Sequence, residues 1–233
     1  MKKIFLVIGL ALLITISVAK PSSAWDVKTT DELQQRMNEV GFKILNANRI
    51  EKRFMFMAIN RVYTRDIWTD VSSVNRIVWI KPTVLPYIND DNELAAILSH
   101  SLAHGIDTYE GIFRGYISIL NYWVAPNKYD LKADKTAVDF MVNAGYNPVA
   151  MIIVMSKSFP QARYDWWWFS HPLTSRRMME VYEYIYKKYP EYLVNNKYKD
   201  NPYYQNFLLT SKENRTKFQK KVETNSKKAV KYL

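Results

Sequence analysis

The hydrophobic period of the sequence changes near Pro82, and this change decides the fold class. Before Pro82, residues 54–59 and 74–80 form short aromatic and β-branched runs bounded by polar residues, a pattern typical of strands. After Pro82, apolar residues recur every three or four positions, as they do on one face of a helix. The sequence therefore predicts an α+β fold that is mostly helical and contains one small sheet.

Capping and breaking residues indicate where the helices begin and end. Asp90 to Glu93 supply caps and acidic residues for a helix start, and Gly145 to Pro148 interrupt a later helix. Helices are predicted at 31–50, 90–106 and 131–144, from 148, and after 172. The last of them is expected to bury a stripe of six side chains, Met178, Met179, Val181, Tyr182, Ile185 and Tyr186.

The composition limits the chemistry that the chain can perform. Its 233 residues are appropriate for one globular domain, and 48% of them are hydrophobic. The chain contains no cysteine, which excludes disulfides, thiolate metal ligands, iron–sulfur ligation and a thiol nucleophile. Any metal ion must therefore be held by histidine and carboxylate side chains.

The first 24 residues have the pattern of an export signal. Two lysines precede an uncharged apolar run over residues 4–19, and the small residues Ser22 and Ala24 occupy the positions expected before a cleavage site. An uncleaved membrane anchor is the alternative, but the run is short for a spanning helix and Pro21 follows it. The sequence predicts a signal peptide over 1–24 and an exported protein, with the periplasm as the expected location and a secreted or membrane-associated protein as alternatives.

The positive charge is concentrated at the C-terminus. The formal net charge is +11, and residues 211–233 contain eight Lys or Arg against two Glu. The rest of the chain is only mildly basic, so no nucleic-acid partner is expected. Residues 201–233 are predicted to form a basic C-terminal tail, which is either a solvated helix or a segment that attracts anionic membrane surfaces.

Two of the three histidines predict a metal site. His100 and His104 are four residues apart in the best-defined helix, so both imidazoles lie on one face, one turn apart. A tetrahedral metal ion takes two ligands from one helix in this way. The alternative is a pair of buried imidazoles that are hydrogen-bonded to backbone carbonyls.

The third ligand is left open by spacing alone. Asp130 and Asp134 are four residues apart at the start of the next helix, so one could bind the metal while the other orients an imidazole. Asp107 is the competitor on the histidine helix, but it lies a further turn along.

The histidine helix resembles that of a known enzyme family. Residues 92–104, NELAAILSHSLAH, are similar to the "ELAAVLAHEIAH" helix of the zinc metallopeptidases related to the CAAX prenyl protease and HtpX. Residues 130–148, which begin DLKAD, resemble the family's "ExxAD … m.raGydP" segment, and 170–177, SHPLTSRR, resemble its "SHPpt.eR" motif. Three motifs in family order over roughly residues 54–186 make the resemblance specific.

The resemblance implies a role for each matching residue. His100 and His104 correspond to the zinc ligands on the helix, and Asp130 corresponds to the Glu that completes the site. Asp134 corresponds to the Asp that supports the ligand helix and its histidines, and His171 to a residue beside the substrate or the metal. A zincin-like metallopeptidase domain over 25–200 is implied, with a strand edge that holds a peptide by strand addition.

Two positions depart from the family pattern, and they change the expected activity. Ser101 stands where the family has the HExxH glutamate, which accepts a proton from the zinc-bound water. Serine has no base form near neutral pH, and loss of a general base costs about 10² to 10⁴ in rate. Asp130 is one methylene shorter than Glu, which implies weaker zinc binding. The sequence therefore predicts a zinc-binding domain with little or no peptidase activity and a peptide or envelope protein as partner.

Two alternatives remain open at this stage. The chain is an active zinc endopeptidase if His171 serves as a replacement base. It is a basic envelope-associated binding protein if the metal site is vestigial and the aromatic cluster at 164–169 and the tail make the contacts.

Overall fold

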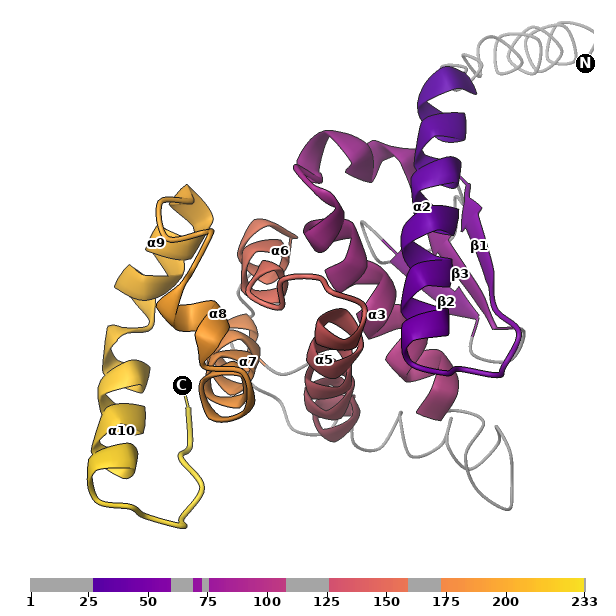
Figure 1. The fold of residues 1–233 in the computed structure, drawn as a ribbon. Coiled ribbons are helices and arrows are strands. Elements are labelled where there is room, and N and C mark those ends of the chain that lie inside the picture. The colour runs from indigo at the N-terminus through magenta and orange to yellow at the C-terminus, as the bar shows by residue number, and fades with distance from the viewer. Residues whose placement is uncertain (1–26, 60–68, 73–75, 108–125, 159–172, 233) are drawn as a thin grey trace, which may run out of the picture.

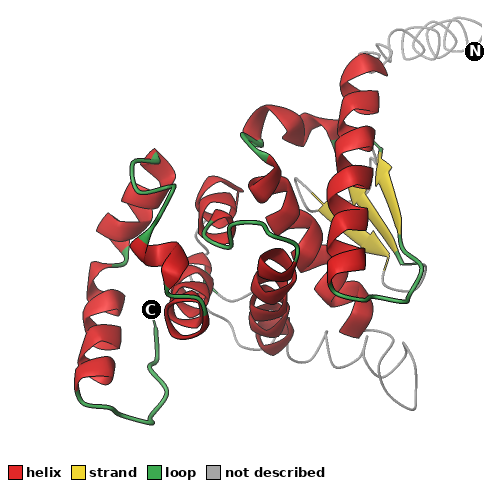
Figure 2. Cartoon of the chain, viewed as in Figure 1, coloured by secondary structure: helices red, strands yellow, loops and turns green. Residues whose placement is uncertain are grey.

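The structure is a computed structural model that describes residues 27–59, 69–72, 76–107, 126–158 and 173–232. Within these ranges the chain is mostly helical with one small sheet (Figure 2), which confirms the α+β class. The helices are α2 (Val27–Ala47), α3 (Asp91–Asp107), α5 (Pro126–Asn143), α6 (Ala150–Ser158), α7 (Thr174–Lys188), α8 (Glu191–Val194), α9 (Pro202–Thr210) and α10 (Lys212–Glu223), with the 3-10 helix η1 (Pro82–Tyr87).

The sheet has three strands, β1 (Met55–Ala58), β2 (Thr69–Ser72) and β3 (Ile77–Ile80), in the order β1-β3-β2. β1 runs parallel to β3, and β2 runs antiparallel to it. β1 and β3 lie within the two predicted strand segments. β2 adds to the prediction, because its sequence TDVS contains one apolar residue and no alternation that would indicate a strand.

The outer edge of β1 is closed by a side chain of α2. The Gln34 amide donates from Nε2 to the Phe56 carbonyl at 2.8 Å, and its Oε1 accepts from the Ala58 N–H at 2.9 Å. One amide thus satisfies two backbone groups that a further strand would otherwise bind. Closing an edge in this way prevents unwanted strand pairing.

Two helix glycines permit close approach of aromatic rings from the β1 segment. A Cβ atom on Gly41 of α2 would lie 2.5 Å from Cζ of Phe56, and one on Gly105 of α3 would lie 2.6 Å from Cε1 of Phe54. Each ring therefore occupies the space of a missing side chain. This contact places the sheet beside the segment of α3 that carries His104.

Helix α3 lies at the centre of the molecule, in contact with α2, α5 and α6 (Figure 1). Its start is capped as the sequence predicts, because Oδ1 of Asp90 accepts from the Glu93 N–H at 3.0 Å. Glu93 is 1% exposed and binds Nζ of Lys157 on α6 through both oxygens, at 2.7 and 2.8 Å. The apolar side chains Leu94, Leu98 and Leu102 are fully buried and anchor the helix in the core.

Residues 201–232, expected to form a tail, pack on the helical body. α9 contacts α6, and α10 contacts α7 and α9, at the end of the molecule opposite the sheet (Figure 1). Phe207, Phe218 and Tyr232 are buried in the main core. Residues 201–232 therefore contribute side chains to the same core as the preceding helices. Tyr186 differs from its prediction, since it is 42% exposed and its ring meets the Phe218 ring edge-on at 5.1 Å.

Three expectations lie outside the described residues, namely the signal segment 1–24, the aromatic cluster 164–169 and His171. In the part of the chain that the structure describes, no helix combines the length and the apolar character needed to cross a bilayer.

Candidate metal centre

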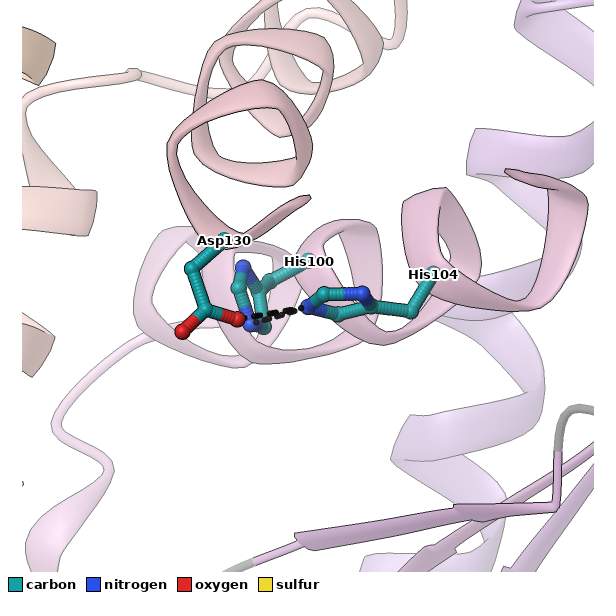
Figure 3. Close-up of side chains that lie close together, drawn as sticks. All are labelled: His100, His104 and Asp130. Carbon is teal, nitrogen blue, oxygen red and sulfur yellow. Dashed lines mark hydrogen bonds and ion pairs between the residues drawn. The ribbon is translucent and has the colours of Figure 1, made fainter. Parts of the chain in front are cut away.

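The i, i+4 spacing of His100 and His104 brings their imidazoles together on α3. Nε2 of His104 lies 3.2 Å from Nε2 of His100, and the rings meet edge to face with their centroids 4.6 Å apart. Figure 3 shows a ring nitrogen of His104 facing both the His100 ring and the Asp130 carboxylate. Each side chain is 19% exposed, so the pair is partly open to the outside.

Asp130 on α5 is the carboxylate that faces the two imidazoles (Figure 3). Its Oδ1 lies 3.3 Å from Nε2 of His104, and the residue is 1% exposed. One ligand atom from each of His100, His104 and Asp130 lies within 4.8 Å of the others, and this group could hold a metal ion. Asp107 instead pairs with Lys132, at 2.7 Å between Oδ1 and Nζ.

Two of the three spacings between ligand atoms agree with tetrahedral coordination, and the third is within 4.8 Å. Metal–ligand bonds of 2.0–2.2 Å at a tetrahedral angle place neighbouring ligand atoms about 3.3–3.6 Å apart. The 3.2 Å between the two His Nε2 atoms and the 3.3 Å between His104 and Asp130 are close to this value. Two imidazoles and one carboxylate are also a donor set that zinc accepts, with a fourth position left for water.

The expected positions of the imidazole protons also favour a cation between these side chains. Nδ1 of His100 faces a carboxylate of Asp134, which favours a proton on Nδ1 and leaves Nε2 with a lone pair in that ring form. Nε2 of His104 has two close neighbours, His100 and Asp130, and a single proton there can be donated to only one of them. Lone pairs therefore converge on one point, which a metal ion would satisfy.

Asp134 lies behind His100, as expected for a residue that supports a ligand. It is fully buried, and its Oδ1 lies 2.9 Å from Nδ1 of His100, although this contact is not ideally aligned for a hydrogen bond. Arg177 of α7 binds the same carboxylate through two hydrogen bonds. Its Nε donates to Oδ2 at 2.8 Å, and its Nη2 donates to Oδ1 at 2.7 Å. The carboxylate thus joins α3, α5 and α7.

Arg177 is the site residue that sequence reasoning missed. The residue lies within the SHPLTSRR segment, but the motif comparison gave it no role. A signal was present, because Arg177 falls on the same helical stripe as the buried Met178 and Val181. An arginine on a buried stripe needs a buried acid, and Asp134 is that acid.

The electrostatics keep His100 neutral and Asp134 charged. Burial lowers the pKa of His100, and its contact with Asp134 opposes this only in part. Burial alone would raise the pKa of Asp134, but the charge and hydrogen bonds of Arg177, together with His100, hold that pKa below its usual range. A neutral imidazole beside a charged acceptor is the form that binds a metal.

Ser101 occupies a closed position on α3. It is 1% exposed, and among the described residues its Oγ has no hydrogen-bond partner. Nothing there withdraws its proton, so the hydroxyl is not activated as a nucleophile. The group of His100, His104 and Asp130 could hold a metal ion, and Ser101 is not part of it.

Comparisons of the chain with protein-family models, with curated proteins and with solved structures gave no match. The geometry of the side chains, together with the motif resemblance, is what a functional proposal has to rest on.

Proposed function

We propose that the chain is an exported zinc-binding domain of the zincin-like metallopeptidase kind whose peptidase reaction is lost or greatly slowed. The observation that carries this proposal is the convergence of His100, His104 and Asp130, with ligand-atom spacings of 3.2 and 3.3 Å. Asp134 behind His100 adds support, because histidine ligands of metal sites are commonly oriented by such a carboxylate.

The chain's own residues account for both binding and low activity. A bound zinc ion would supply a water molecule of lowered pKa. His100, His104 and Asp130 would hold the ion. The proton of that water needs an acceptor, and Ser101 at the family's glutamate position cannot accept it near neutral pH.

Metal analysis of the purified protein tests the binding step. We expect about one zinc per chain, as for a site of three protein ligands and water. His100→Ala and His104→Ala should abolish this binding, and Asp130→Ala should weaken it. Asp107→Ala is the matched control, since this aspartate pairs with Lys132 away from the site. Zinc loss in the control with retention in Asp130→Ala would contradict the assigned ligands.

Casein cleavage with a chelator-treated blank tests the activity. We expect little cleavage by the wild type and a gain approaching the general-base factor of about 10² to 10⁴ in Ser101→Glu. Ser101→Ala should behave as the wild type. Because Ser101 is 1% exposed, the larger side chain must displace its surroundings, and circular dichroism should verify the fold. Combining Ser101→Glu with Asp130→Glu tests whether ligand length limits the gain.

Two results would favour the alternative functions. Chelator-sensitive cleavage by the wild type would indicate an active endopeptidase with a replacement base. A wild-type protein that binds no zinc would indicate a binding protein whose metal site is vestigial.

Export, partners and membrane attraction belong to the same proposal. A mature N-terminus at Trp25, measured by mass spectrometry, tests the export of the chain to the periplasm. Membrane attraction by the basic C-terminal segment could be tested by deleting that segment, but Phe218 and Tyr232 are buried, so the deletion would disturb the core. Charge reversal of three exposed lysines, Lys227, Lys228 and Lys231, is therefore the better test of binding to anionic vesicles. Each lysine should contribute at most about 1 kcal/mol to the binding free energy. Unchanged vesicle binding would remove this part of the proposal.

A further inference from the structure

We propose that Arg177 is a positioning residue for the metal centre, which acts through Asp134 to fix the orientation of His100. This inference rests on the proposed zinc-binding function and adds a residue to it. The three side chains come from three helices, Arg177 from α7, Asp134 from α5 and His100 from α3.

The contact between Arg177 and Asp134 is bidentate. Nε and Nη2 of the guanidinium donate to different carboxylate oxygens, at 2.8 and 2.7 Å. A single donor would leave the carboxylate free to rotate about the bond to Cβ. Two parallel donors from a planar group fix both its position and its plane. Because Arg177 is 4% exposed and Asp134 is fully buried, water does not compete for this contact.

The fixed carboxylate in turn determines how His100 presents its ring. Oδ1 of Asp134 lies 2.9 Å from Nδ1 of His100, and although the two atoms are not ideally aligned for a hydrogen bond, the charge of Asp134 favours a ring proton on Nδ1, on the side away from the metal centre. Nε2 then presents its lone pair toward His104 and Asp130, 3.2 Å from Nε2 of His104. Without the guanidinium, Asp134 could turn and the imidazole could exchange its proton between the two nitrogens.

A second ion pair joins the same two helices and provides a control. Nζ of Lys135 on α5 lies 2.7 Å from Oε2 of Glu180 on α7, and neither residue belongs to the group of His100, His104 and Asp130. If Arg177 only held α5 against α7, then removing either pair would have a similar effect on the site. If Arg177 positions His100, only its own substitution should affect the imidazole.

The first test uses the zinc-free full chain and nitrogen-15 NMR of the histidine rings. We expect His100 to be in the Nδ1–H form in the wild type and in Glu180→Gln. In Arg177→Lys we expect a mixture of the two ring forms of His100. Lysine retains the charge but cannot make the planar bidentate contact with Asp134. An unchanged His100 signal in Arg177→Lys would overturn the inference, and so would an equal change in Glu180→Gln.

The second test measures zinc affinity by competition with a chelator and records the visible spectrum of the cobalt(II)-loaded protein. We expect zinc affinity to fall about 10- to 100-fold in both Arg177→Lys and Asp134→Asn, as for other changes behind a ligand. The double variant should lose little more than either single one, because both act through one contact. The cobalt spectrum should change in the two variants and not in Glu180→Gln.

The two tests separate this inference from the proposed function. If the wild type binds no zinc but the His100 form changes in Arg177→Lys, then the positioning role holds and the zinc proposal fails. If the wild type binds zinc and Arg177→Lys retains both the ring form and the affinity, then the zinc proposal holds and the positioning role is overturned.

Discussion

Helix α3 contributes side chains to one polar group near each of its ends, and the two groups use their lone pairs differently. At the N-terminal end, both oxygens of Glu93 accept from Lys157, and one also accepts from the Asn89 N–H at 3.0 Å. Toward the C-terminal end, the nitrogen and oxygen atoms of His100, His104 and Asp130 face one another. The first group is an ion pair between side chains of opposite charge, whereas the second brings two imidazoles and a carboxylate together.

This difference distinguishes a structural ion pair from a candidate metal site on one helix. Glu93 and Lys157 are side chains of opposite charge, 1% and 4% exposed, which satisfy each other. A cation would gain nothing there. At the other end a cation would gain several lone pairs at once, which is the condition for metal binding. Burial of an acid is therefore a poor guide to function unless its partners are counted.

The largest loss of stability is expected from breaking the ion pair between Glu93 and Lys157. Glu93→Ala leaves the buried ammonium group of Lys157 without its carboxylate partner. Such a loss typically lowers the unfolding free energy by about 3–5 kcal/mol. Urea unfolding followed by circular dichroism measures this loss. Asp91→Ala is the control, because its pair with Arg36 is exposed and such pairs contribute about 0–1 kcal/mol. Zinc binding by the folded fraction should persist.

A small stability loss in Glu93→Ala, comparable to that of the control, would contradict the view that this end is structural. A complete loss of zinc in a folded Glu93→Ala protein would show that the two ends of α3 are not independent.

A third buried acid, Glu183 on α7, extends the comparison to pH. It accepts from Lys187, from Lys221 and from the Tyr232 hydroxyl, so it resembles Glu93. Burial raises its pKa, but these donors outweigh burial and lower the pKa to about 2. A folded-state pKa below the unfolded value gives stability that is present above about pH 4.5 and is lost as the pH falls toward 2, with an upper limit of about 3 kcal/mol.

The measurement is the unfolding free energy of the wild type and of Glu183→Gln between pH 2 and pH 7. The difference between the two proteins should shrink as the pH falls through this window. Glu213→Gln is the control, since Glu213 is 72% exposed and its pair with Lys217 is of the kind that contributes about 0–1 kcal/mol. A pH-independent difference for Glu183→Gln would mean that the cluster does not hold the C-terminal segment as described.

Zinc should stabilise the protein through the His100, His104 and Asp130 group by mass action. At a free zinc concentration 100 times the dissociation constant, a ligand of the native state adds about 2.7 kcal/mol to the unfolding free energy. We expect this gain in the wild type and none in His100→Ala, measured by thermal unfolding at several zinc concentrations. Equal stabilisation of His100→Ala would place the bound zinc elsewhere.

The sequence predicted the parts of the site that lie on one helix or match a motif. The spacing of His100 and His104 implies their proximity, because helix geometry alone fixes which residues share a face. The choice of Asp130 over Asp107 required the packing of α5 on α3, which spacing did not settle, although the motif resemblance pointed to Asp130. Arg177 was missed because its contact with Asp134 spans 43 positions of the sequence, a separation that no local pattern encodes.

The fold was predictable to a similar extent. Helices follow from period and caps, and Asp90 caps α3 as predicted. β2 was not predictable, since a strand with one apolar residue is defined by its pairing with β3. The packing of Phe218 and Tyr232 was also hidden, because isolated aromatic residues within a lysine-rich segment have no helical stripe to mark them as core.

The smallest effects are expected at the two glycines that contact the β1 segment, and they test whether the sheet supports the metal centre. Gly105→Ala places a Cβ 2.6 Å from the Phe54 ring, and Gly41→Ala places one 2.5 Å from the Phe56 ring. Overpacking costs about 1–3 kcal/mol and the gain in helix propensity returns up to about 1 kcal/mol, so each variant should lose about 1 kcal/mol of stability. Only Gly105 adjoins His104, so only its substitution should weaken zinc binding, by up to about tenfold. Chelator competition on both variants measures the difference. Equal zinc affinities would mean that α3 and α5 hold the ligands without help from the sheet, whereas a loss confined to Gly105→Ala would show that the Phe54 ring helps to set the position of His104.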